Sequence, residues 1–301
     1  MFAFSRHYAR TVFATQASSA TLRARRSPRS GRPDEELAVS EATTTSPDAE
    51  EGRRQRLRRQ TLRELDAAAL DEVREHGAVD LSLRRVARRM GMSPAGLYRY
   101  VDSREALLTR LIAGAYHDLA DHLEAAIGGE VVRGEDAPTL AVPEVAGSDA
   151  DVADRLRAAA LAYRAWAVAH PQEFGLLFGD PIPNYAAPPG GETVAAMGRV
   201  GTALGRPLVE ASTSGRLRPV TDAVAADLRD RLGGLTGVTG RELPAEVAVT
   251  LLVTWGRLHG QVSLEVFGHH DWLFPDGCEA LYRVEVAAIL RDLGVVDDRP
   301  R

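Results

Sequence analysis

Residues 82–108, SLRRVARRMGMSPAGLYRYVDSREALL, hold six arginines, two tyrosines and one proline within 27 residues. Few of these side chains can serve a protein core, because charged residues separate the apolar ones throughout. A stretch this basic is typical of a surface that meets a polyanion. The remaining apolar positions therefore decide how the stretch folds.

Apolar spacing predicts two short helices joined by a tight turn. The first covers about residues 83–90, with apolar residues three and four apart and Ser82 able to cap its start. Gly91 breaks this helix. Ser93 can cap the second short helix, and Pro94 takes its first position, where the missing N–H costs nothing.

Longer helices are predicted on both sides of this pair. A preceding helix begins at Arg53 and ends at His76-Gly77, where glycine stops it. Ser103 can cap a following helix that runs to about Ile127. Two short helices joined by a glycine turn and braced by a longer one make a helix-turn-helix. In this arrangement the four arginines at 84, 85, 88 and 89 point away from the core.

The second short helix of such a unit enters the major groove of DNA, so its outer face must suit phosphates or base edges. Small residues at 94–96 allow a close backbone approach, tyrosine hydroxyls and arginines can bind phosphates, and Arg84 can pair bidentately with guanine. The alternative is that these arginines are solvated surface and the tyrosines ordinary packing. The residues expected at the DNA are Ser82, Arg84, Ser93, Pro94, Ala95, Gly96, Tyr98, Arg99, Tyr100 and Arg104.

Charge divides the chain at the same place. Residues 53–110 hold 14 arginines against eight acids, a surplus of six. Residues 111–301 hold 16 arginines against 27 acids, a deficit of eleven. This asymmetry indicates a basic DNA-binding module attached to an acidic body.

The rest of the chain shows helical patterns and loops without a convincing period-two strand, so the predicted fold is all-α. We expect a disordered, basic and Ser/Thr-rich tail at 1–52, the helix-turn-helix domain at 53–115 and a larger helical domain at 116–301. A linker is predicted at 128–149 and a loop at 179–191. Further helices are predicted at about 150–169, 172–178, 192–213, 220–232, 244–268 and 276–293.

Targeting signals, cysteine chemistry and metal motifs do not point to a different function. Residues 1–33 carry seven arginines and no acid, which fits an organellar transit peptide, a simple basic tail or a start codon placed too far upstream. The single cysteine, Cys278, excludes an internal disulfide and suits a reducing cytoplasm. No apolar run reaches the roughly 18 residues of a membrane span. His269-His270-Asp271 is expected at the surface, without a metal, and no cofactor is expected.

Residues 58–108 resemble the N-terminal domain of the tetracycline-repressor (TetR) family of regulators. The likeness lies in the first short helix, the GMS turn, the LYRY recognition helix and the SREALL start of the following helix. It implies that Tyr98, Tyr100 and Arg104 bind phosphates. It also implies that Arg84 and residues 94–96 lie near base edges.

Two segments of the acidic body resemble the Trp-His-Gly subclass of the same family. They are YRAWAVAHPQEFGLLFG at 163–179 and TWGRLHGQVSLEVFG at 254–268. The resemblance implies a domain that dimerises and binds a small-molecule effector. A largely apolar effector site is expected near these segments, although each residue alone is more readily an ordinary core residue. Its residues would be Tyr163, Trp166, His170, Phe174, Phe178, Trp255 and His259.

The last two predicted helices offer a dimer interface. Apolar residues recur every three or four positions over 247–266 and 282–293. Gly256 and Gly260 lie four residues apart on the same face of the predicted helix. Each glycine costs helix stability, which is understandable if another helix must approach this face closely. Two such helices from each subunit would form a four-helix interface, and the homodimer would present two heads to a palindromic operator in double-stranded DNA.

Three functions remain open. The first is a dimeric transcriptional regulator, a repressor that a small effector releases from its operator. The second is a DNA-binding regulator whose body binds a protein partner. An enzyme is not expected, because a helical hydrolase built on His259, Glu265 and Asp271 would lack a recognisable nucleophile elbow, phosphate loop or metal spacing.

Overall fold

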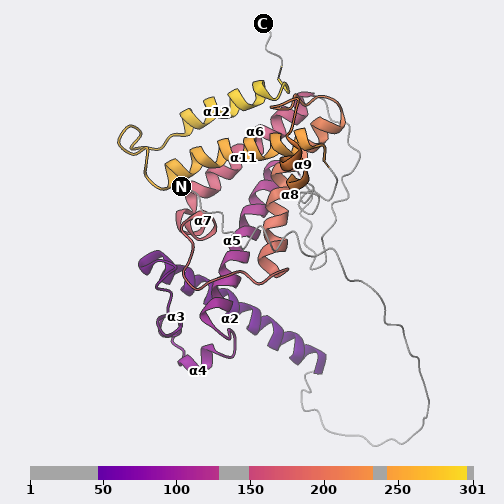
Figure 1. Cartoon of the computed structure of the whole chain (residues 1–301). Helices are drawn as coiled ribbons and strands as arrows, with labels where there is room; N and C mark the ends of the chain where they lie inside the picture. Colours follow the sequence, from indigo (N-terminus) through magenta and orange to yellow (C-terminus); the bar gives the residue numbers. More distant parts are fainter. Residues whose placement is uncertain (1–46, 129–148, 233–242, 297–301) are drawn as a thin grey trace, which may run out of the picture.

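The computed structural model describes residues 47–128, 149–232 and 243–296, and these residues form helices and loops without a strand. The all-α prediction is thereby confirmed. The basic DNA-binding module, which we call the head, lies at one end of the molecule, and we call the remaining helical part the body (Figure 1). Its helices are α2 (Pro47–His76), α3 (Leu83–Arg89) and α4 (Pro94–Leu97).

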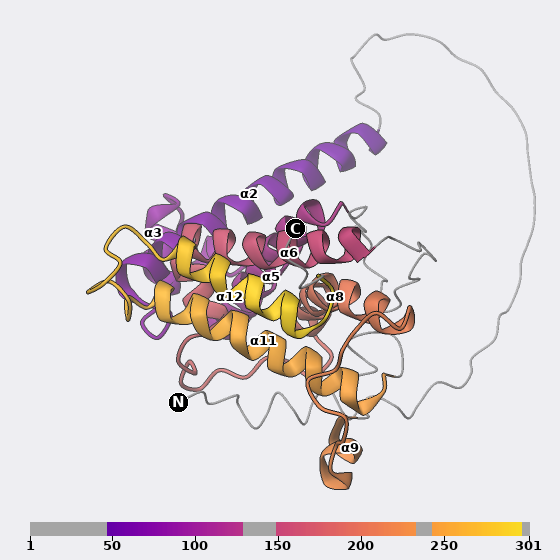
Figure 2. The same cartoon turned by 90° about the horizontal axis from the view of Figure 1, so that it is seen from above.

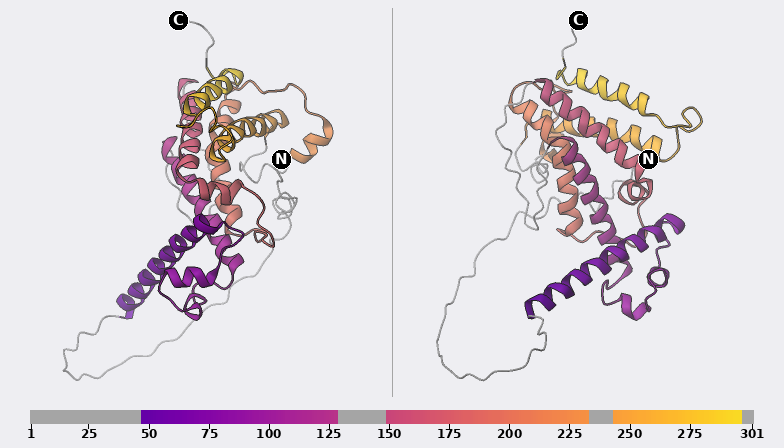
Figure 3. Two further views of the ribbon diagram at one scale, coloured as in Figure 1. Left: turned by 90° about the vertical axis from the view of Figure 1, so that its left-hand side faces the viewer. Right: turned by 180° about the vertical axis from the view of Figure 1, so that it is seen from behind.

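The body stands on the head, and α5 (Arg104–Ala126) runs from one into the other (Figures 1 and 3). Seen from above, α11 and α12 lie side by side at the end of the molecule opposite α4 (Figure 2). Within the described ranges, no helix is both long and apolar enough to cross a membrane. The body helices are α6 (Asp149–Ala169), α7 (Pro171–Phe178), α8 (Glu192–Thr213), α9 (Ala226–Leu232), α11 (Ala245–Val266) and α12 (Glu279–Asp292).

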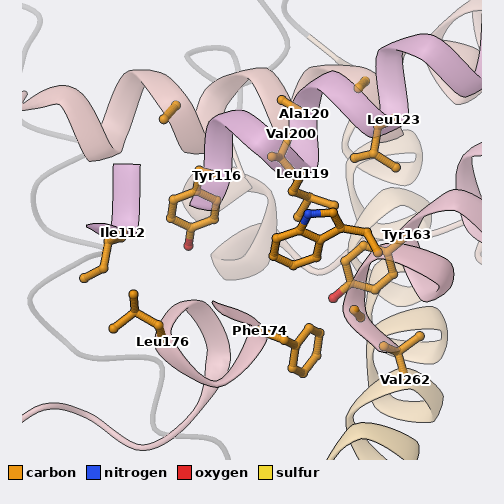
Figure 4. Packing of buried hydrophobic residues seen from close by; sticks show 14 of the residues in the cluster. Ile112, Tyr116, Leu119, Ala120, Leu123, Tyr163, Phe174, Leu176, Val200 and Val262 are labelled. Carbon is orange, nitrogen blue, oxygen red and sulfur yellow. The ribbon is translucent and has the colours of Figure 1, made fainter. Parts of the chain in front are cut away.

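One hydrophobic core extends from the head into the body, and α5 is its axis. This helix buries Leu107 and Leu108 in the head and Leu119 and Leu123 in the body. In the body, side chains from α6, α7, α8 and α11 close around it, with Tyr163 and Phe174 pointing into the shared interior (Figure 4). Because one continuous helix serves both parts, a displacement of α5 in the body must also displace the head.

Polar contacts fix α8 against α5. The Arg199 guanidinium on α8 donates to Asp121 (2.8 Å) and Glu124 (2.6 Å) on α5, and its Nη1 lies 3.1 Å from His117 Nδ1. Burial and the neighbouring Arg199 charge lower the pKa of His117. The imidazole is therefore neutral at pH 7, which suits a ring held against a cation.

The helix boundaries correct the sequence predictions in two places. Residues 47–52, predicted as tail, form the start of α2, because the arginines and glutamines that follow favour a helix and Gly52 is tolerated within it. Residues 220–225, predicted as helix, are irregular. There the Val220 N–H donates to Thr250 Oγ1 (3.1 Å), and the Thr221 hydroxyl donates to the Ala223 carbonyl (2.8 Å), which competes with helical bonds.

The remaining predicted helices are confirmed to within a few residues, as is the loop at 179–191. Residues 1–46 of the predicted tail lie outside the described residues. So do positions 129–148, which contain most of the predicted linker.

Candidate nucleic-acid interface

The turn between α3 and α4 has the predicted geometry. Gly91 has a φ of +65°, a conformation that favours glycine. Ser93 caps α4, and its hydroxyl accepts a hydrogen bond from the Gly96 N–H at 3.1 Å. A Cβ at Gly96 would lie 3.3 Å from that hydroxyl oxygen, so a small residue here preserves the cap. Ser82 takes the N-cap position of α3, but its side chain makes no capping hydrogen bond, contrary to the prediction.

The outer surface of α3 and α4 is polar, and α4 lies at the tip of the head (Figure 1). Leu97 is fully buried and anchors α4 to the core, whereas Tyr98 is 52% exposed. Tyr100 is partly buried against the core, so less of its ring faces outward. The other exposed side chains of this surface are Arg84, Arg88, Arg89, Ser93, Pro94, Ala95 and Arg99.

One of the four α3 arginines, Arg85, turns inward, which corrects the prediction that all four face away from the core. Arg85 Nε donates to the buried Glu72 carboxylate on α2, whereas Arg89 stays exposed and donates to Glu75 on the surface of α2. His76 Nδ1 also lies 3.4 Å from Glu72. Glu72 follows Leu65 by seven residues on the apolar stripe of α2, and a carboxylate in that position is the sequence signal for an internal ion pair.

Arg104 also has a structural position. Its guanidinium donates to the carbonyls of Ala78 (2.9 Å), Val79 (2.8 Å) and Leu81 (3.2 Å) in the loop between α2 and α3. These bonds use donors that a phosphate would need, and they tie the loop to the start of α5. The phosphate contact expected of Arg104 stays a prediction, because Nε and Nη2 bind these carbonyls while Nη1 lies 3.9 Å from Glu105 at the surface. Arg88, which was not among the residues expected at the DNA, is exposed on α3.

Five of the seven expected effector residues come together in the body: Tyr163, Phe174, Phe178, Trp255 and His259. The His259 ring is their centre. It stacks on Trp255 at a centroid distance of 5.0 Å, and the rings of Phe178 and Phe174 lie 4.9 and 5.7 Å away. We call these five residues the aromatic cluster.

Trp166 and His170 do not join the aromatic cluster. They stack on each other at 5.3 Å, and the Trp166 indole N–H donates to Asp118 on α5 at 2.6 Å. Trp166 is almost fully buried. These two expected effector residues therefore belong to the packing between α6 and α5.

Burial sets the charge state of the aromatic cluster. Desolvation lowers the pKa of His259 from 6.5 to about 4 and raises the pKa of Tyr163 well above its ordinary value. Both groups are neutral at pH 7, with the Tyr163 hydroxyl 2.7 Å from His259 Nδ1 and the Ser263 hydroxyl 3.3 Å from Nε2. The cluster is thus an apolar environment with polar atoms at one ring, which suits an uncharged ligand better than an ion.

The three residues of the hydrolase hypothesis have separate partners. Glu265 accepts from Arg164 Nε at 2.7 Å and from the Cys278 N–H at 2.9 Å. Burial alone would raise the pKa of Glu265, but these donors lower it overall, so the carboxylate is not a proton carrier at neutral pH. Asp271 is exposed in the loop after α11, while His259 contacts Tyr163 and Ser263.

Ion pairs join the head to the body beside α7. Glu173 on α7 is buried and accepts from Arg74 on α2 at 2.6 Å. Arg110 on α5 forms a two-pronged pair with Asp66 on α2, at 2.5 and 2.7 Å. Next to these pairs lies a cavity of about 140 Å³. It is lined by Asp66, Leu70, Arg110, Leu111, Gly114, Ala115, Asp118, His170 and Glu173.

The outward face of α11 is apolar. Leu252 and Val253 are 47% and 43% exposed, and a Cβ at Gly256 or Gly260 would meet nothing within 4 Å. Among the described residues, no other helix comes within contact distance of a side chain at these two positions. The periodic residues that were expected at the dimer interface pack inside the protomer instead, because the same period also serves its own core. The buried ones are Val247, Leu258, Val262, Tyr282, Val286, Ile289 and Leu293, and Leu251, Trp255 and Val266 are partly buried against the same core.

Comparison with known proteins agrees with this geometry. A family model described as bacterial regulatory proteins, tetR family, matches residues 66–111, and one described as tetracyclin repressor-like, C-terminal domain, matches residues 156–289. The HTH-type transcriptional regulators Rv1816 of Mycobacterium tuberculosis and Mb1846 of Mycobacterium bovis are each 31% identical over 242 residues, which cover 79% of this chain and 96% of theirs.

Solved structures show the same fold. The crystal structure of the protein SCO4313 is 30% identical and has a TM-score of 0.59, and the match covers 79% of this chain and 98% of that chain. A Rhodococcus protein is 22% identical with a TM-score of 0.53. Fold and matches together define a helix-turn-helix transcriptional regulator. The chain belongs to the tetR family.

Proposed function

We propose that this regulator is a cytoplasmic homodimeric repressor that leaves a palindromic operator when a small, uncharged effector binds in its body. The observation that carries this proposal is the head surface. A capped recognition helix stands at the tip of the molecule, with exposed arginines and Tyr98 around it and its only large apolar residue, Leu97, turned inward. Such a face has no role in the core and fits a duplex groove.

Different residues would perform different parts of DNA binding. Pro94, Ala95 and Gly96 let the backbone approach base edges, and Arg84 reads one base pair. The groups proposed to position the head on the phosphates are Ser82, Ser93, Tyr98, Arg99 and Tyr100. Besides any phosphate contact of its own, Arg104 acts indirectly, by holding the loop in front of α3.

A route from effector to DNA runs through α7. Phe174 and Phe178 on this helix belong to the aromatic cluster, and Glu173 on the same helix is bonded to Arg74 of the head. An effector that separates the rings must displace α7, which carries α2 with it. Binding would thus favour a spacing of the two heads that no longer fits successive groove faces, by as much as its differential affinity for the two states.

The test begins with selection of duplexes from a random pool by the full chain. We expect a palindromic sequence, bound tightly by the wild type. Tyr98→Phe should lower affinity for every duplex alike, whereas Arg84→Ala should relax preference at one base pair of each half-site. A wild-type protein that selects no duplex, or an Arg84→Ala variant that loses affinity equally for all sequences, contradicts the assignment.

A body that binds a protein partner is the second candidate. The rings of the aromatic cluster contact one another directly, and Trp272 and Leu273 in the loop after α11 are 82% and 55% exposed. An uncharged small molecule that raises the melting temperature and releases the operator favours the effector. A Trp272→Ala variant that keeps operator binding but loses regulation in cells favours the partner.

A further inference from the structure

The first half of α2 is strongly basic, and its side chains from Arg53 onward lie at the surface. Residues 52–63 contain six arginines and no acid, and every residue from Arg53 to Gln60 is exposed. The first fully buried side chain of α2 is Leu65. We call residues 53–63 the basic extension.

One side of the basic extension carries a row of arginines. Arg56, Arg59 and Arg63 are three and four residues apart, so they share a face, and they line one open side of α2 together with Gln60 and Glu64. Among the described residues, no acid lies within ion-pair distance of these three arginines. Like charges at this spacing destabilise a helix. An external anion would remove that repulsion.

The basic extension points to the same end of the molecule as the recognition helix. In views that share a vertical axis, the free end of α2 and α4 both lie at the end opposite α12 (Figures 1 and 3). A duplex that receives α4 would therefore pass near the free end of α2. This placement favours DNA over any other polyanion.

We propose that the basic extension is a second DNA-binding element, which contacts the phosphates of the duplex outside the half-site that α4 reads. This inference rests on the proposed function. The row from Arg56 to Arg63 spans about 10 Å along the helix axis, and each DNA strand presents a phosphate about every 3.4 Å of its own axis. About three phosphates therefore lie within reach of three guanidinium groups. Such contacts lengthen the bound site without reading its sequence.

The experiment compares three full-length proteins on duplexes obtained by selection: the wild type, the triple variant Arg56→Gln, Arg59→Gln, Arg63→Gln, and a control with Arg157→Gln, Arg229→Gln, Arg231→Gln. The control removes the same charge from body helices. Each protein is titrated with a core duplex that ends at the selected sequence and with one extended by a helical turn on both sides. Circular dichroism verifies that the three proteins are equally helical.

We expect the wild type and the control to bind the extended duplex about tenfold or more tightly than the core duplex, and the α2 variant to bind both alike. Its salt dependence, the slope of log K against log salt, should fall by about 3 for one protomer and about 5 for two, at roughly 0.9 per lost phosphate contact. Equal flank and salt effects in the α2 variant and the control would overturn the inference while leaving the operator proposal intact. A wild type that selects no duplex would overturn both.

Discussion

Single residues in the head have roles that follow from their backbone or donor atoms. Gly91 is held at a φ of +65°, where a side chain is strained, and Gly96 lies against the cap it must not disturb. Arg104 looks like a phosphate ligand by residue type, yet its donors face three carbonyls of its own chain. Residue type therefore indicates which chemistry is available, and the surroundings decide where it is used.

Gly91→Ala should lower the free energy of unfolding by about 1–2 kcal/mol, because an L side chain disfavours the left-handed conformation. Urea unfolding measures the change. Gly198→Ala is the matched control: it lies within α8, and its Cβ would meet nothing within 4 Å. That control should gain up to about 1 kcal/mol of stability, so a loss of equal size in both variants would contradict the prediction.

Arg104→Ala should lower the free energy of unfolding by about 2–3 kcal/mol, because three carbonyls lose a charged donor. Arg84→Ala removes an exposed arginine and should change stability by less than about 0.5 kcal/mol. Thermal and urea unfolding distinguish the two. An Arg104→Ala protein that is as stable as the wild type but binds DNA weakly would contradict this prediction and indicate that Arg104 binds a phosphate.

The buried His259 imidazole predicts that the free energy of unfolding depends on pH. The folded protein holds the pKa of this imidazole at about 4, below the ordinary 6.5, so the unfolded chain takes up the proton first. This contribution to stability is complete above pH 6.5 and is lost as the pH falls toward 4, by up to about 3 kcal/mol. In urea unfolding between pH 7 and pH 4.5, His259→Gln should lose less stability than the wild type. Parallel losses would show that another group controls the acid sensitivity.

At the scale of elements, α7 and α2 are joined asymmetrically. Glu173 on α7 is buried, while its partner Arg74 on α2 is 45% exposed. One side of the pair has therefore lost its hydration and the other has not. A short helix held in this way can transmit a displacement from the aromatic cluster to the head.

Removing Arg74 and removing Glu173 should lower the free energy of unfolding by different amounts. Arg74→Ala leaves a buried carboxylate without its cation and should lower the free energy of unfolding by about 3 kcal/mol. Glu173→Gln removes the buried charge itself and leaves Arg74 in water, so a change below about 1 kcal/mol is expected. Urea unfolding of both variants at pH 7 measures this difference. Equal losses would mean that the pair contributes through its charge attraction alone.

At the scale of the whole molecule, α11 is apolar on two sides. One side supplies Val247, Leu258 and Val262 to the core of the protomer, while Leu252 and Val253 on the other meet solvent. A helix that is apolar all round is normally buried. The outward side, with the neighbouring α12, is the surface that the proposed dimer would cover.

Leu252→Glu combined with Val284→Glu should convert the proposed dimer to a monomer, because both side chains are exposed on the protomer and a charge would be desolvated in the proposed interface. Analytical ultracentrifugation measures the mass, and operator affinity should fall with it. Leu228→Glu on α9, which is similarly exposed, is the control and should leave the mass unchanged. A double variant that sediments with the wild type would place the interface elsewhere.

Local sequence signals predicted much of the head. The Ser93 cap, Pro94 at the first helical position, the glycine turn and the Ser103 cap act within a few residues, so their spacing alone defines α4 and the start of α5. The inward turn of Arg85 could not be derived in this way, because it depends on Glu72, 13 positions earlier. The same limit applied in the body, where aromatic residues of two segments were assigned to one site although Trp166 and His170 pack elsewhere.

By itself, the sequence determined the all-α class, the helix-turn-helix and the division into basic head and acidic body, because capping, apolar period and charge are properties of neighbouring residues. Only the tertiary structure decided which arginines are free for DNA, which rings gather around His259 and which side of α11 is left uncovered. Those outcomes depend on pairs far apart in the chain, such as Arg104 with the Ala78 carbonyl and Tyr163 with His259. Periodicity gives each helix an inward face, but packing decides what that face meets.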